Sequence, residues 1–382
     1  MLRMIPMKKI FLTIIFALLF SVLLLSVPVR AESGIMEEQI NMLDVSDINK
    51  ALRGSSNTSV NKLDVKDLIS KAVTGKLDMS AGDIMNSIFS GLFSEISAII
   101  SLMRNMILIA VISALFNNLS ASFKQKSIGE LGFYITYIII IVILFSSFRV
   151  CLDVTLNMIS EICLLMESAV PALVSLMVMT GRMTSAYVFN PLLIFIINFI
   201  TRFVRDALVP VIIAAAGLEL INYISGKDLL TKLSGVIKKG VTWAVRATAF
   251  LFIGLLAIQS ISAPIIDSGI LKSAKAVINV VPVVGQALTA AADSVSAWAG
   301  AVKAGTMVVM IIIIILMCAG PVLKLLAFIF IFKITAGLIE PISDSRIVKG
   351  IDAAGSYAAL LLGVNVLVAV MFAFSVMITL SV

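Results

Sequence analysis

The feature that most constrains this chain is a series of long apolar runs from about Ser94 to the C-terminus. The clearest run, Leu131 to Phe148, contains 18 residues and no formal charge. An α-helix rises about 1.5 Å per residue, and a bilayer core of roughly 30 Å needs about 20 apolar residues to span it. Several windows of the sequence reach that length. We therefore predict an all-α, polytopic helical membrane protein.

The composition supports this class and locates the charge. Of the 382 residues, 60% are hydrophobic and 13% are charged, whereas soluble domains carry about 25% charged residues. The formal net charge of +7 is uneven, because residues 32–95 hold ten acidic and six basic residues while residues 96–382 hold 12 acidic and 19 basic ones. The basic excess lies on the membrane part, where it favours a role in setting topology over nucleic-acid binding.

The N-terminus has the pattern of an export signal. Residues 1–9 carry three basic residues and no acidic one, and an apolar stretch follows over residues 10–27. Val29-Arg30-Ala31 then provides small residues at the two positions that define a cleavage site. We predict a signal peptide over residues 1–31, with an uncleaved signal anchor as the alternative. If the signal is cleaved, the next segment lies outside the cytoplasm.

That next segment, residues 32–93, is predicted to be a small acidic extracytoplasmic helical segment. It contains an internal echo, LDVSDI at residues 43–48 and LDVKDL at residues 63–68, separated by the polar linker 54–59. In each copy an acidic residue precedes or opens a helical pattern, as helix N-caps do. We expect two short capped helices that dock on neighbouring elements.

The transmembrane helical domain is predicted over residues 94–382, with about eight transmembrane helices after the signal peptide. The expected spans are 94–116, 131–148, 157–180, 187–204, 207–224, 241–262, 305–323 and 356–380. Residues 306–339 are too long for one simple span and short for two, and they contain Pro321. A proline-kinked tilted helix and a span with a re-entrant piece both fit this stretch.

The loops then give a topology. With the segment 32–93 outside, Lys124, Lys126 and the lysines of residues 227–239 fall inside, in agreement with the positive-inside rule. Lys272 and Lys275 fall outside, so the agreement is partial. Three further charged residues are expected outside, at the tip of a hairpin: Arg202, Arg205 and Asp206.

Two segments between the spans have their own character. Residues 227–239 place leucine, valine and isoleucine on one helical face with lysines largely opposite, which predicts a basic interfacial helix or a short connecting helix. Residues 263–305 are rich in small residues, with a probable turn at 282–285. Small-residue helices pack closely, so this segment could line an assembly interface or a wide lumen.

Ionisable and amide side chains at membrane depth are costly and usually face partners or water. Glu219 and Asn222 lie one helical turn apart on one face, whereas Glu161 and Glu167 share a face only loosely. Such residues predict a conduction path or subunit contacts, and snorkelling or intramolecular pairing is the alternative. The candidate residues are Arg104, Glu161, Glu167, Glu219, Asn222, Lys324, Lys333 and Asn365.

Nothing in the sequence indicates catalysis. The chain has no histidine, which excludes Ser-His-Asp and Cys-His nucleophile systems and histidine metal sites. There is no GxxxxGK[ST], HExxH or GxSxG motif, so we expect no ATP motor and no hydrolase elbow. We predict that the protein is not an enzyme and binds no cofactor or metal.

Five short motifs occur in a distinctive order along the membrane part. They are FNPLL at 189–193, SAPIIDSG at 262–269, PVVG at 282–285, KLLAF at 324–328 and LIEPI at 338–342. In this order they resemble the stage III sporulation AE family of spore-forming Firmicutes, over about residues 95–380. The N-terminal residues match that family only in layout.

The resemblance implies a component of the channel complex that joins the mother cell to the engulfed forespore. It implies a multi-pass location in the mother-cell membrane surrounding the forespore. The implied partners are other proteins of the stage III sporulation operon, including an ATPase and ring-forming proteins, and a forespore-side channel partner. It implies no catalytic residues. Two other classes remain open on the residues alone: a stand-alone secondary transporter of a small solute, and a membrane scaffold with no conducting path.

Overall fold

The computed structural model describes residues 40–55, 60–76, 81–122, 126–225, 231–278 and 284–381. Throughout these ranges the regular structure is helical, which confirms the all-α prediction. The predicted signal peptide, residues 1–31, lies outside the described residues. The helices are α3 (Ser46–Arg53), α4 (Val65–Val73), α5 (Ala81–Ser122), α6 (Lys126–Met179), α7 (Met183–Phe203), η1 (Val204–Leu208), α8 (Val209–Ser225), α9 (Thr231–Ile278), α10 (Val284–Ile339) and α11 (Ser345–Ser381).

The two short helices of the predicted acidic segment are α3 and α4. The carboxylate of Asp64 caps α4, accepting hydrogen bonds from the backbone N–H of Lys66 at 2.9 Å and of Asp67 at 3.4 Å. In the first copy of the echo, Asp44 accepts from the backbone N–H of Ser46 at 3.0 Å, one residue ahead of the helix cap. The apolar faces of α3 and α4 are buried against α6 and α10, so both helices dock on neighbours as predicted.

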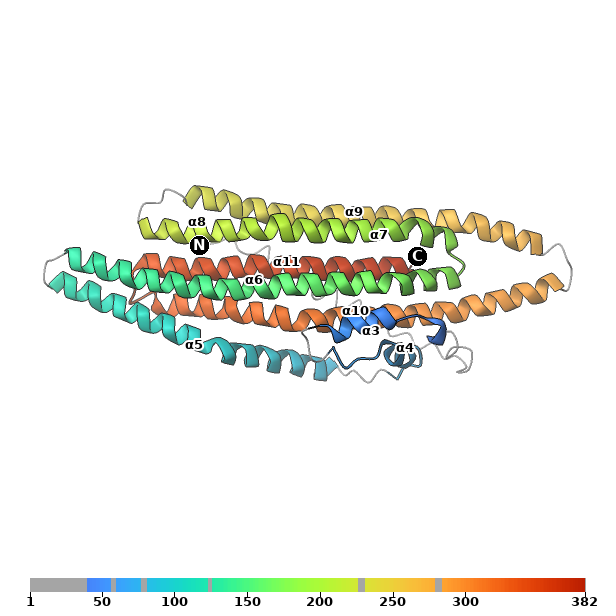
Figure 1. Cartoon of the computed structure of the whole chain (residues 1–382), viewed down its shortest axis with the longest axis horizontal. Coiled ribbons are helices and arrows are strands. Elements are labelled where there is room, and N and C mark those ends of the chain that lie inside the picture. Colours follow the sequence, from blue (N-terminus) through green and yellow to red (C-terminus); the bar gives the residue numbers. More distant parts are fainter. Residues whose placement is uncertain are drawn as a thin grey trace.

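The long helices run antiparallel in an elongated bundle (Figure 1). α6 has 54 residues and α10 has 56. At 1.5 Å per residue these helices are about 80 to 85 Å long, far more than the roughly 30 Å core of a bilayer. Three pairs of consecutive helices turn back at the same end of the bundle: α5 and α6, α8 and α9, and α10 and α11 (Figure 1). We call this the turn end, and α3 and α4 lie in the opposite half.

Two pairs of predicted spans are each one continuous helix, which corrects the expected hairpins. Spans 131–148 and 157–180 both lie within α6. Spans 187–204 and 207–224 are joined through η1, a π-helical segment with helical backbone on both sides. Charged residues in these stretches do not end the helix, because they lie on an exposed helical face and no glycine or proline interrupts residues 149–156. Arg202, Arg205 and Asp206 are therefore on the side of a helix and not at a hairpin tip.

The eight-span count is not reached. Among the described residues, four helices are long and apolar enough to cross a membrane, over Ser90–Phe116, Leu131–Met179, Trp298–Ile339 and Ser345–Leu380. Pro321 lies inside α10, so residues 306–339 are part of one helix, as the kinked-helix alternative required. Residues 231–239 are the first turns of α9 and do not form a separate interfacial helix. The small-residue segment 263–305 supplies the end of α9 and the start of α10, with 279–283 outside the described residues.

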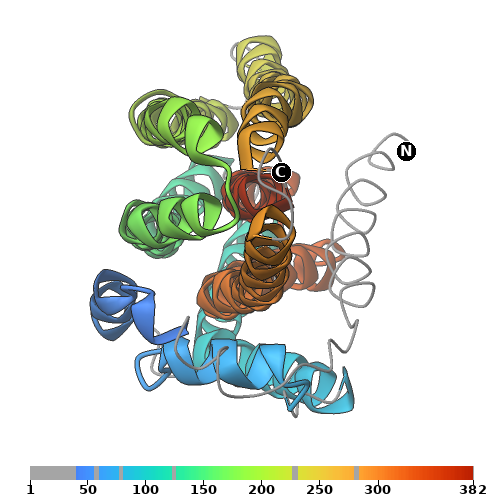
Figure 2. The same ribbon diagram turned by 90° about the vertical axis from the view of Figure 1, so that its right-hand side faces the viewer.

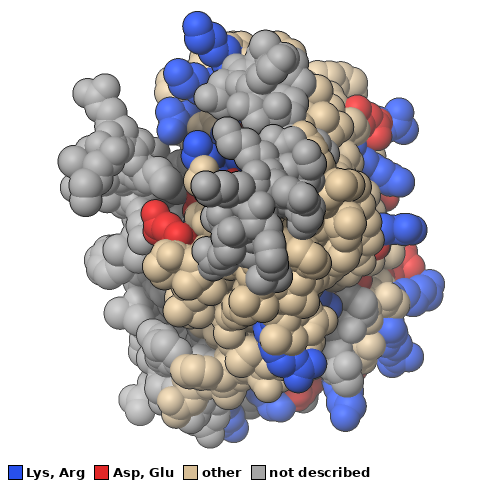
Figure 3. All heavy atoms as spheres, turned by 90° about the vertical axis from the view of Figure 1, so that its left-hand side faces the viewer, with Lys and Arg blue, Asp and Glu red and all other residues tan. Residues whose placement is uncertain are grey.

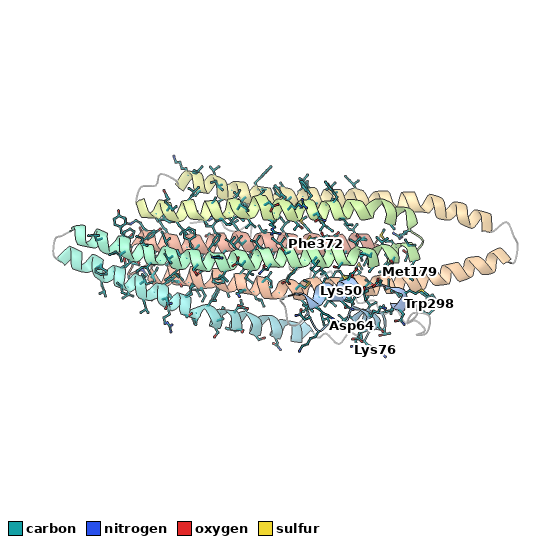
Figure 4. All side chains as sticks on the ribbon, viewed as in Figure 1. Lys50, Asp64, Lys76, Met179, Trp298 and Phe372 are labelled. Carbon is teal, nitrogen blue, oxygen red and sulfur yellow. The ribbon has the colours of Figure 1, made fainter. Side chains whose placement is uncertain are left out.

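α11 is the central helix of the bundle, surrounded by α6, α8, α9 and α10 (Figure 2). Its side chains Tyr357, Leu361 and Val364 are completely buried. On the far side of α10, Gly305 lies so close to α4 that a Cβ atom there would stand 2.3 Å from Val73 Cγ2. Gly305, a small residue of the 263–305 segment, therefore allows close packing of α10 against α4 within the same chain. Trp298 and Met179 lie in the same half of the bundle as α3 and α4 (Figure 4).

Candidate functional site: a charged cavity near the turn end

A cavity of about 350 Å³ opens where α8, α9, α10 and α11 come together. Its wall holds three lysines and three carboxylates, brought together from four separate segments of the chain. Figure 3 looks at this end of the molecule, where lysine and arginine side chains lie around the outline of the view with acidic side chains among them. The polar residues of the cavity wall are Glu219, Tyr223, Lys238, Lys333, Glu340, Lys349, Asp352 and Ser356.

One part of the wall is an ion pair between α10 and α11. The Lys333 ammonium lies 2.6 Å from Asp352 Oδ1 and also donates to the Asp352 carbonyl at 3.2 Å and to Ser356 Oγ at 2.9 Å. Gly355 permits this approach, because a Cβ atom there would meet Phe332 Cβ at 3.1 Å and the Lys333 side chain at 3.5 Å. The three donors of the ammonium are all used, so this pair fixes the register of the two helices.

The second part of the wall is a carboxylate held by two tyrosines. The Tyr357 hydroxyl of α11 donates to Glu219 Oε2 at 2.5 Å, and the Tyr223 hydroxyl donates to Glu219 Oε1 at 3.0 Å. Hydrogen bonds to an ionised carboxylate are short and strong, and Tyr357 is fully buried. Glu219 therefore ties α8 to the central helix while one edge of its carboxylate still borders the cavity.

Lys238 of α9 completes this side of the cavity. Its ammonium lies 4.9 Å from the centre of the Tyr357 ring, a cation–π arrangement. Lys238 is half-buried, and it faces the cavity together with Glu219. An ammonium in this position can bind an anionic group that enters the cavity.

The predicted polar residues divide into two groups. Glu219 and Lys333 come together at the cavity, from helices more than one hundred positions apart. The other six lie elsewhere: Arg104 and Glu167 are exposed, Glu161 accepts a 2.7 Å hydrogen bond from Ser55 Oγ, Lys324 is half-buried on α10, and Asn222 and Asn365 are buried. Neither amide atom of Asn365 makes a hydrogen bond within the described part of the chain.

Sequence reasoning missed several residues of the site. Asp352 stands just before the expected final span at 356–380, and Lys238 falls on the polar face expected for an interfacial helix. Tyr223 and Tyr357 carry no signal of their own, since tyrosine is common near membrane interfaces. The spacing of Asp352 and Ser356, four residues apart in a run of small residues, is the one pattern that could have indicated a polar helix face. In the described ranges, no group of three or more His, Cys, Asp or Glu side chains is placed to hold a metal ion.

A family model described as stage III sporulation protein AE matches residues 63–382. The chain belongs to the stage III sporulation protein AE family. The matched region runs from just before α4 to the C-terminus, so it contains every residue of the cavity wall and extends further toward the N-terminus than the motif resemblance did.

A curated relative in this family is the stage III sporulation protein AE of Bacillus subtilis (strain 168). It is 24% identical over 301 residues, which cover 78% of this chain and 75% of the relative. No solved structure matches the chain. Membership of the family connects this protein with sporulation, and its apolar helices indicate a membrane protein.

Proposed function

We propose that this chain is the integral membrane component of the mother cell–forespore channel complex, permease-like and without a motor of its own. The observation that carries the proposal is the cavity, which places charges of both signs inside a membrane-type bundle of the stage III sporulation protein AE family. Such charges are expensive in a membrane protein unless they serve a solute, an ion or a partner. The cavity would be the entrance of a path for small polar solutes, and the chain itself would carry out no chemical reaction.

The proposed location is the mother-cell membrane surrounding the forespore, with the turn end in the mother-cell cytoplasm. The first residues of α9 and of α11, which include Lys232, Lys239 and Lys349, make this end basic, as the positive-inside rule requires of a cytoplasmic face. The proposed partners are the other proteins of the stage III operon, including an ATPase that would supply energy and ring-forming proteins, and a channel protein on the forespore side.

A stand-alone secondary transporter of a small solute is the second candidate. The same cavity favours it, because about 350 Å³ is within the range of small-molecule sites and its wall offers both ammonium and carboxylate groups. The two candidates differ in when the protein is needed: a channel component is needed in sporulation, whereas a general transporter would also affect growing cells.

The first experiment separates them and tests the cavity. The gene is deleted in the native host, and growth, engulfment and heat-resistant spores are scored separately. The deletion is then complemented with wild-type protein, with Lys238→Ala, and with the matched control Lys239→Ala, whose side chain is exposed and does not line the cavity. Equal amounts of each protein are checked by immunoblot.

The proposal expects normal growth, a block after engulfment, and at least about a tenfold loss of spores with Lys238→Ala but not with Lys239→Ala, because an unbalanced charge is costly at membrane depth. A growth or uptake defect with intact sporulation would favour the transporter. A sporulation block in the deletion that both lysine variants restore fully would favour a scaffold without a conducting path.

A further inference from the structure

The outward face of α6 changes its chemistry halfway along the helix. Over the first half the exposed side chains are almost all apolar: Leu131, Tyr134, Ile135, Ile138, Ile139, Val142 and Phe145. Beyond Arg149 the exposed positions become mainly polar: Val150, Asp153, Asn157, Ser160, Leu164, Glu167, Pro171 and Ser175. The second half of α6 is also rich in apolar residues. Those side chains, such as Ile159, Ile162 and Leu165, are buried inside the bundle and are not part of its outward face.

α5 shows the same change in the opposite chain direction. Its last turns expose Leu108, Val111, Ile112, Leu115 and Phe116. Its earlier turns expose mainly serines and other polar residues, with two large apolar side chains among them: Ser90, Phe93, Ser94, Ser97, Ala98, Ile100, Ser101, Arg104 and Asn105. Since α5 and α6 are antiparallel, both apolar faces belong to the turn end of the bundle (Figure 1).

A cross-helix hydrogen bond shows that exposed side chains change from apolar to polar at a similar depth on α5 and α6. Thr136 Oγ1 donates to Ser113 Oγ at 3.1 Å, which aligns α6 with α5. From this bond Arg104 is nine residues away and Arg149 is thirteen, or about 14 and 20 Å toward the α3/α4 half at 1.5 Å per residue. The two helices therefore expose their first arginine at nearly the same depth.

The continuous helix formed by η1 and α8 also exposes charged residues at a similar depth. The Tyr137 hydroxyl donates to the Leu220 carbonyl at 2.9 Å, which aligns α6 with α8. Arg205 and Asp206 are exposed and lie 15 and 14 residues from Leu220, about 21 to 23 Å toward the α3/α4 half. Charged residues on three separate helices thus mark one boundary around the bundle.

The distance from the turn end to this boundary fits a bilayer. The apolar face of α6 from Leu131 to Arg149 is about 27 Å long, close to the roughly 30 Å hydrocarbon core. We propose that lipid surrounds only the turn-end half of the bundle. The other half, with α3 and α4, projects into the aqueous space, and α6 from Arg149 to Met179 extends about 45 Å beyond the boundary.

Apolar exposure continues past the charged level on one side of the bundle. On the α7/α9 side, large apolar side chains stay exposed past the charged level, as far as Phe195 of α7 and Ile258 of α9. Lipid along the full length of α6 is disfavoured, because exposed Asp153 and Glu167 carboxylates would then lie in hydrocarbon.

Cysteine accessibility tests this inference in the full chain. Cys151, Cys163 and Cys318 are first replaced by alanine, and the parent is checked for sporulation in the host. Single cysteines are then introduced as Ile138→Cys, Val142→Cys, Asn157→Cys and Ser160→Cys, all at exposed positions of α6. Membranes are opened so that a water-soluble maleimide reaches both faces, and labelling rates are compared with those in SDS.

Residues 157 and 160 are expected to react at least about ten times faster than 138 and 142, because the thiolate that reacts forms only in water. The α5 pair Ser97→Cys and Val111→Cys should repeat the difference, with residue 97 reactive. Protection of all four α6 positions, or labelling of all four, would overturn the proposal. So would the reverse order, which would place the bilayer around the α3/α4 half.

Discussion

Tyr357 of the central helix α11 donates a 2.5 Å hydrogen bond to Glu219 of α8, a residue 138 positions away in the chain. The same carboxylate accepts from Tyr223 one helical turn along α8, and the Tyr357 ring lies beneath the Lys238 ammonium. This one contact therefore connects three helices at the wall of the charged cavity. It links the stability of the bundle to the chemistry of the cavity.

Tyr357→Phe should destabilise the bundle. The change keeps the buried ring but leaves the partly buried Glu219 with one donor fewer, and loss of a hydrogen bond to a charged acceptor costs about 1–3 kcal/mol. The measurement is thermal unfolding of the purified protein in detergent. Tyr134→Phe, at an exposed position on α6, is the control and should leave the unfolding temperature unchanged. Equal unfolding temperatures for the two variants would show that the Glu219 contact contributes nothing.

The Lys333–Asp352 pair should show a measurable but modest coupling. Both side chains are partly exposed, at 32% and 51%, so a double-mutant cycle with Lys333→Met and Asp352→Asn should give about 0.5–1 kcal/mol. The coupling should shrink in high salt. Lys349→Met combined with Asp352→Asn is the comparison cycle and should give a smaller coupling, about 0.2–0.5 kcal/mol, because these two residues are only neighbours three apart on α11. A coupling that is the same in both cycles would argue against a specific ion pair.

Gly305→Ala should loosen the docking of α4. The new Cβ atom would meet Val73 Cγ2 at 2.3 Å, and overpacking of this kind costs about 1–3 kcal/mol. Gly300→Ala is a matched control on the same helix, since nothing lies within 4 Å of its Cβ position, and it should stabilise α10 slightly. Limited proteolysis of the segment containing α3 and α4 measures the difference. Faster cleavage of the Gly300 variant would contradict the packing argument.

The start of α11 should be sensitive to acid. Burial alone would raise the pKa of Asp344, but the side chain and backbone N–H of Arg346 donate hydrogen bonds to it and hold its pKa below the ordinary value of 3.8. Because the folded pKa is the lower one, this stabilisation is complete above the unfolded pKa and is lost as pH falls through the folded pKa.

Asp344→Asn should therefore lower stability by about 1 kcal/mol at neutral pH, through loss of a charged helix-end contact. Its difference from wild type should shrink below about pH 4. The measurement is a series of unfolding curves between neutral and acidic pH. A difference that stays constant across the series would mean that ionisation of Asp344 is not the cause.

Several elements could be predicted from local patterns. Asp64 precedes a helical pattern and does cap α4, and the apolar runs are helical wherever the structure describes them. The second half of α6 could not be interpreted correctly in the same way. Its apolar residues have the composition of a membrane span, yet most face the bundle interior, and its outward positions are largely polar. Composition does not distinguish side chains that meet lipid from side chains that meet other helices.

The residues of the candidate site could also be predicted only in part from the sequence. Glu219 and Lys333 could be singled out because ionisable residues are rare in apolar helices, but their partners could not. Asp352 and Lys238 lie near the ends of apolar runs, where sequence alone indicates solvent or an interface. Conversely, Arg104 and Glu167 satisfied the same criterion and lie on exposed faces away from the cavity. An ionisable residue in an apolar helix indicates an energetic cost, but the sequence does not show which partner or solvent contact offsets that cost.

By itself the sequence determined that this protein is helical, that it is built for a membrane and that lysines cluster at residues 124–126 and 227–239. These properties follow from helix hydrogen bonds between residues four apart and from the apolar content of each stretch, so they depend on near neighbours only. Tertiary structure decided which spans were single long helices and which charges met at the cavity. Those contacts join residues up to 138 positions apart, and they exist only once α11 is enclosed by its neighbours.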